Sequence, residues 1–163
     1  MSGVTEREAL LNALRDQRNR VLRAVAGLPD AALRQPVLRS GRTCLGLVQH
    51  LALDVERFWF RAVLAGEAVD LCSEGEAWRV DSATPASAVL DTYREDLREA
   101  DRVLHRMNSM GSQHGGPQRS SPTCRCETSA RPSWRCSWRR PANAGHLDAV
   151  RELLDGHQDL VLT

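Results

Sequence analysis

Aliphatic side chains recur at helical spacing in four stretches of this chain, and that periodicity constrains the fold more than any other feature. We expect the four helices to cover residues 5–28, 43–65, 84–104 and 144–154. Gly27 and Pro29 are typical of the end of the first helix, and the connection that follows has room for one short helical turn. The pattern predicts an all-α fold, a bundle with three regular helices and a truncated fourth.

The second of these stretches has the clearest start and the broadest apolar face. Thr43 is a suitable N-cap, and Cys44 in the first turn is expected to be a structural cysteine. With an α-helical repeat, the apolar face contains Leu47, Leu51, Val55, Phe58 and Trp59. We expect Phe58, Trp59 and Phe60 to be core residues, because aromatic side chains at helical spacing usually pack.

Length and charge exclude several classes of protein. The 163 residues fit a single domain, residues 1–163, and no apolar run approaches the roughly 20 residues that a bilayer span needs. The polar residues 1–8 lack the apolar core of an export signal, so we expect a cytoplasmic location and cysteines that remain thiols. A net charge of +1 argues against capture of the whole chain by nucleic acid or a membrane.

On the third helix, Glu95, Asp96 and Glu99 predict a solvated face with salt bridges.

Residues 108–142 depart from the pattern of the rest of the chain. These 35 residues contain no Leu, Val, Ile, Phe or Tyr, but they contain six Arg and two Trp. One interpretation is a disordered basic loop. The other is translation out of frame, because a chain with 22 Arg and no Lys indicates GC-rich codons, which yield Arg in shifted frames. Local pattern and global fold conflict here, so we expect an atypical, loop-like segment.

Three short motifs on the predicted helices are specific enough to compare with known families. Residues 45–51 are Leu-Gly-Leu-Val-Gln-His-Leu, residues 55–60 are Val-Glu-Arg-Phe-Trp-Phe, and residues 144–148 are Ala-Gly-His-Leu-Asp. Together they resemble the DinB-like superfamily, in its branch of actinobacterial mini-circle-type proteins. Relatives in that branch include metal-dependent thiol S-transferases and mycothiol-dependent maleylpyruvate isomerase. The resemblance covers residues 6–105 and 143–156.

The resemblance implies an up-and-down-type four-helix bundle with a divalent metal, zinc or nickel, near one end. In the family, one His on helix 2 and two His or Glu residues one turn apart on helix 4 hold the metal. His50 falls at the helix-2 position, whereas Arg139 and Asn143 fall at the helix-4 positions. A guanidinium has no free lone pair and an amide is a weak zinc ligand. A further histidine, His146, lies one turn beyond the second helix-4 position. The candidate metal residues are therefore His50 and His146.

Two hypotheses of different classes follow. The first is a scaffold of a metal-dependent and thiol-dependent transferase or isomerase, with impaired metal binding. Its partner would be a small molecule or a thiol such as mycothiol, which a metal would ionise to thiolate. The second is a non-enzymatic binding module, in which the basic segment 108–142 contacts an acidic partner. Nucleic acid is the weaker choice of partner for this segment, because out-of-frame GC-rich DNA already explains its Arg content. A homodimer is compatible with the exposed faces of such a bundle.

Overall fold

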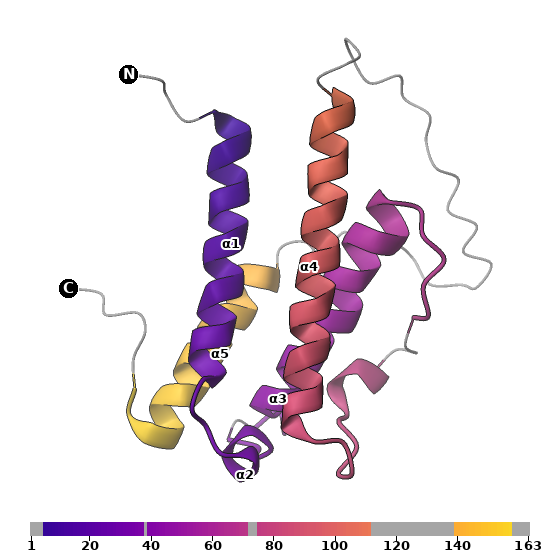
Figure 1. The fold of residues 1–163 in the computed structure, drawn as a ribbon. Helices are drawn as coiled ribbons and strands as arrows, with labels where there is room; N and C mark the ends of the chain where they lie inside the picture. The colour runs from indigo at the N-terminus through magenta and orange to yellow at the C-terminus, as the bar shows by residue number, and fades with distance from the viewer. Residues whose placement is uncertain (1–4, 38, 72–74, 112–138, 158–163) are drawn as a thin grey trace. The chain divides into compact units, whose positions relative to one another are not determined.

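In the computed structural model, residues 5–37, 39–71, 75–111 and 139–157 are described, and they contain helices and connections but no strand. The elements, in chain order, are α1 (Glu6–Val25), α2 (Asp30–Leu33), α3 (Cys44–His50), the π-helix η1 (Leu51–Leu64), the 3-10 helix η2 (Glu76–Trp78), α4 (Ala86–Gly111) and α5 (Arg139–Asp155) (Figure 1). The all-α fold class predicted from the sequence is confirmed. Within the described ranges, no helix is both long enough and apolar enough to cross a bilayer.

The chain divides into two compact units. Residues 1–47 and 134–163 form the first unit, and residues 48–133 form the second. In the first unit, α1 and α5 lie side by side, and their C-terminal ends are together (Figure 1). The apolar side chains buried in this unit come from α1, α2, α3 and α5, and include Val21, Val25, Leu33, Leu45, Leu147 and Val150.

Helix α1 is fixed at both ends by side chains. At its start, the Glu8 backbone N–H donates to Thr5 Oγ1 at 3.3 Å, and the Glu8 carboxylate accepts from the Thr5 backbone N–H at 2.8 Å. This reciprocal capping box satisfies two of the N–H groups that a helix start leaves unpaired. At its end, Arg151 Nη1 of α5 donates to the backbone oxygens of Ala24 at 3.2 Å and Ala26 at 2.6 Å. One guanidinium therefore ties α5 to the last turn of α1.

In the second unit, η1 and α4 run parallel to each other (Figure 1). Two ion pairs join this part of the chain to α4. Arg57 of η1 pairs with Asp96, and Glu67, just after η1, pairs with Arg106. In both pairs the two residues are 39 positions apart. A constant offset of this kind means that the two helices advance in the same direction. Consecutive helices of an up-and-down bundle are antiparallel, so the up-and-down connectivity implied by the resemblance is wrong for this pair.

Helix α3 continues directly into η1, whose backbone is a π-helix rather than the α-helix that the sequence predicts. Its last turn ends with a hydrogen bond from the Ala65 N–H to the Phe60 oxygen at 3.0 Å, five residues back. The buried residues of η1 are Leu51, Ala52, Val55, Glu56 and Phe60. This wider repeat places Phe60 in the core, as predicted, and leaves Phe58 and Trp59 only half-buried. The prediction that Phe58 and Trp59 are core residues is therefore wrong.

The predicted N-cap of the second helix is confirmed, because the Gly46 N–H donates to Thr43 Oγ1 at 3.0 Å. Helix α4 extends to Gly111 and α5 begins at Arg139, so both are longer than predicted. The two ends of the atypical segment 108–142 are therefore helical. Residues 112–138 lie outside the described residues, and the expectation of a loop-like segment within one domain stays a prediction there.

Candidate functional site

His50, the last residue of α3, is buried, with only 6% of its surface exposed. Its Nδ1 lies 2.9 Å from Asp54 Oδ2, one turn further along the same helix. A carboxylate accepts hydrogen bonds, so this contact favours the tautomer in which Nδ1 carries the proton and Nε2 keeps its lone pair. Nε2 has no hydrogen-bond partner among the described residues. A histidine oriented in this way presents its second nitrogen as a base or a ligand.

The indole of Trp78 fixes the plane of the His50 ring. The two rings are stacked, with centroids 3.9 Å apart and an angle of 18° between their planes. Gln49 holds the segment that carries this indole, because its Nε2 donates to the backbone oxygens of Ala77 at 3.1 Å and Arg79 at 3.2 Å. Two consecutive residues of α3 therefore position η2, one through hydrogen bonds and the other through ring stacking.

The contact between Trp78 and His50 was missed by the sequence analysis, although Trp78 lies in a polar segment between two predicted helices. A large indole in a polar segment is a signal in itself, because it needs an apolar or aromatic surface to cover it. The sequence does not indicate which surface that is, since 28 residues separate the two rings along the chain.

A chain of ion pairs runs along the same unit. Asp96 of α4 is 1% exposed and accepts from Arg57 Nε at 3.2 Å and from Arg57 Nη2 at 3.0 Å. Arg61 Nη1 lies 3.6 Å from the same carboxylate, and Arg61 Nε donates to Glu67 at 2.9 Å. The prediction that Asp96 belongs to a solvated face is wrong, because it is paired and buried between the helices.

These contacts shift the pKa values of two members of this chain of ion pairs, Glu67 and Arg61. The hydrogen bond from Arg61 lowers the pKa of Glu67 below its ordinary value of 4.5, and a second hydrogen bond from Arg106 acts in the same direction. The same bond to Glu67 raises the pKa of Arg61. Both groups therefore stay charged at neutral pH, and the chain of ion pairs is intact there.

His146 belongs to the other unit, where it is exposed on α5. It lines a hollow of about 210 Å³ together with Cys44, Leu47 and Leu147. Burial raises the pKa of the Cys44 thiol to about 11, despite the opposing effect of the Arg151 charge. Cys44 is therefore a protonated thiol at neutral pH, in agreement with the structural role expected from the sequence.

The residues at the ligand positions that the resemblance implies, His50, Arg139 and Asn143, do not make up a three-ligand metal site. Within the described residues, no three His, Cys, Asp or Glu side chains come together as a possible metal site. The expected helix-4 ligand positions, Arg139 and Asn143, fall in the first turns of α5. A guanidinium and an amide cannot replace the two missing imidazole or carboxylate ligands there.

Comparison with known proteins supplies the family. A family model described as mycothiol-S-transferase matches residues 9–156, which is most of the chain. No curated protein and no solved structure matches the chain significantly. The matched range contains the helix-2 motif around His50, the whole of segment 108–142 and the motif around His146. The mycothiol-S-transferase family is part of the DinB-like superfamily, so the resemblance seen in the three motifs is confirmed. The chain belongs to the mycothiol-S-transferase family.

Proposed function

We propose that this chain is a mycothiol-dependent transferase scaffold in which metal binding is impaired. The observation that supports the proposal is the residue pair at the helix-4 ligand positions, Arg139 and Asn143. A catalytic zinc site needs three protein ligands and one open position. With only one family ligand retained, the chain has the scaffold for thiol chemistry without the metal affinity to ionise the thiol.

His50 is the ligand that the chain retains, and its surroundings support that role. The carboxylate of Asp54 and the indole of Trp78 orient the ring so that Nε2 keeps an unshared lone pair. His146 is the second candidate metal residue, exposed on α5 one turn beyond the family position. A site with fewer than three protein ligands holds zinc far more weakly than the three-ligand set, so we expect weak and substoichiometric binding.

The partner that the family implies is a thiol, and mycothiol is the proposed one. A cytoplasmic location is part of the same proposal, because thiol cofactors are kept reduced there. The alternative, a binding module that uses the basic segment 108–142, falls almost entirely on residues outside the described ranges and stays a prediction.

Metal content tests the proposal directly. Protein purified without chelator should carry much less than one zinc or nickel per chain by elemental analysis. The double variant Arg139→Glu with Asn143→His restores the family donor set and should bind one zinc per chain, and this binding should disappear when His50→Ala is added. The matched control, Arg140→Glu with Ala144→His, moves the same donors by one position and should not bind. Tight one-to-one binding by the unmodified chain, lost in His50→Ala, would contradict the impairment.

A further inference from the structure

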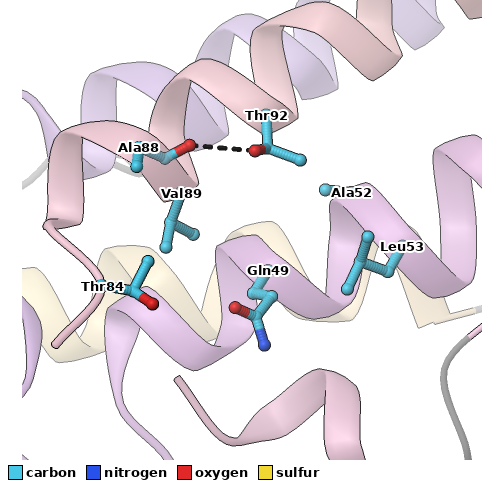
Figure 2. Close-up of a pocket in the computed structure, with 7 residues that line it drawn as sticks. All are labelled: Gln49, Ala52, Leu53, Thr84, Ala88, Val89 and Thr92. Atoms are coloured by element: carbon cyan, nitrogen blue, oxygen red, sulfur yellow. Dashed lines mark hydrogen bonds between the residues drawn. The ribbon is translucent and has the colours of Figure 1, made fainter. Parts of the chain in front are cut away.

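A hollow between α4 and the α3–η1 helix lies within the second unit and takes no part in the proposed metal chemistry (Figure 2). Its volume is about 220 Å³, and its apolar lining comes from Ala52, Leu53 and Val89. For comparison, an apolar cavity of about 150 Å³ binds benzene in an engineered protein. The hollow is therefore large enough for a molecule with a single ring.

None of the residues that line this hollow is charged. A charged ligand would lose its hydration there without gaining an ion pair, which makes its binding unfavourable. The ligand that fits is neutral and mostly apolar.

Two of the polar side chains that line the hollow, Gln49 and Thr92, use their hydrogen-bond donors elsewhere and keep lone pairs to accept. Both hydrogens of Gln49 Nε2 are used by the backbone oxygens of Ala77 and Arg79, which also fixes the orientation of the amide. A flipped amide would place its oxygen against these two carbonyl oxygens, which is unfavourable. Gln49 Oε1 is therefore on the side of the amide that faces away from Ala77 and Arg79. Oε1 has no hydrogen-bond partner in the described part of the chain.

Thr92 has the same character. Its hydroxyl donates to the Ala88 oxygen at 2.9 Å, as drawn in Figure 2, so the lone pairs of Thr92 Oγ1 remain to accept. A ligand that carries a hydroxyl or N–H group complements such a site. A ligand with only acceptor atoms does not complement Gln49 Oε1 and Thr92 Oγ1, because its lone pairs would meet theirs.

We propose that this hollow is a binding site for small neutral aromatic or alicyclic molecules that carry one hydroxyl donor, with the ring against Leu53 and Val89 and the hydroxyl donating to Gln49 Oε1. The inference does not depend on the proposed function, since none of the lining residues is a candidate metal ligand. It assigns a ligand class to a surface that neither the family match nor the metal site explains.

Phenol is the probe, and anisole of similar size is the matched probe without a donor. Titration of the full chain with phenol should give saturable shifts of the Gln49 side-chain amide signals in ¹H–¹⁵N spectra, with a Kd on the order of 1 mM. Anisole should bind about threefold to tenfold more weakly, because the hydroxyl hydrogen bond is lost. Equal binding of the two probes would overturn the hydroxyl requirement.

Two variants at exposed positions of α4 locate the site without disturbing the core. Ala88 lines the hollow, and Ala88→Leu should fill it and weaken phenol binding at least tenfold. The neighbouring Ser87 is exposed and does not line the hollow, so Ser87→Leu should leave the Kd unchanged. Unchanged binding in Ala88→Leu, or no saturable shift at Gln49 in the unmodified chain, would overturn the proposal.

Discussion

The α1–α5 pair and the η1–α4 pair differ in the polar contacts that tie their helices. In the first pair, Arg151 donates to backbone oxygens at the end of α1. In the second, carboxylates and guanidinium groups alternate along the helices, from Arg57 through Asp96 and Arg61 to Glu67. A carbonyl oxygen does not titrate and a carboxylate does. The contacts described for the second pair therefore depend on acid and salt, whereas the bonds from Arg151 to the backbone oxygens of α1 do not titrate.

The largest effect is expected at the buried carboxylate of the second pair. Asp96→Ala removes the carboxylate that pairs with Arg57 and Arg61 and leaves these two charges without that partner. The free energy of unfolding should fall by about 3 kcal/mol. Urea denaturation measures the loss. Asp91→Ala is the matched control on the same helix, because the pair that Asp91 forms with Arg94 is exposed, and it should cost less than about 0.5 kcal/mol. Equal midpoints for the two variants would mean that the buried ion pair adds no stability.

A smaller and more local effect is expected in the first pair. Arg151→Met keeps the aliphatic stem but loses the bonds to the end of α1, which should cost about 2 kcal/mol. Hydrogen exchange should then speed up in the last turn of α1 and in α5, and stay unchanged in η1 and α4. Leu153→Ala serves as the control, because this side chain is 64% exposed. Equal acceleration in both units would mean that they open together.

The smallest effect concerns acid. Hydrogen bonds lower the pKa of Glu67 in the second pair and of Glu8 at the start of α1. A lowered folded-state pKa stabilises the protein above the unfolded value of 4.5, and this contribution is lost as the pH falls through the folded value. Both Glu67→Gln and Glu8→Gln should therefore flatten the decline of stability below pH 4.5, as measured by thermal unfolding between pH 3 and pH 6. An unchanged pH profile in Glu67→Gln would show that its pairing with Arg61 is not formed in solution.

The starts of α1 and α3 were predictable because their signals are local, whereas the end of α4 and the start of α5 were not. Thr43 is the N-cap that the sequence predicted, and Thr5, where the first predicted helix begins, caps α1. Predictions of which side chains face the core were less accurate, because they depend on the number of residues per helical turn. An α-helical period placed Phe58 and Trp59 on the buried face, whereas the π-helical backbone buries Glu56 and Phe60. Nothing in the local sequence distinguishes these two repeats, because both place apolar residues four apart.

The candidate site was predictable only at the residue that carries a family motif. His50 was identified from its motif, but the ring that covers it and the amide that holds that ring in place come from contacts over 28 to 30 residues. The burial of Asp96 was likewise invisible, because its arginine partner lies 39 residues away on another helix. Charge patterns along one helix describe the face of that helix and do not indicate what packs on it.

The parallel arrangement of η1 and α4 has a consequence for the order of folding. Their contacts join residues 39 positions apart, whereas Arg151 and the oxygen of Ala24 are 127 positions apart. Closing the longer loop costs about 1 kcal/mol more in chain entropy, so η1 and α4 are expected to associate first. During synthesis, α1 must wait until α5 has left the ribosome. In that interval the apolar face of α1 lacks the side chains of α5 that cover it in the folded unit, which makes α1 a segment that a chaperone would bind.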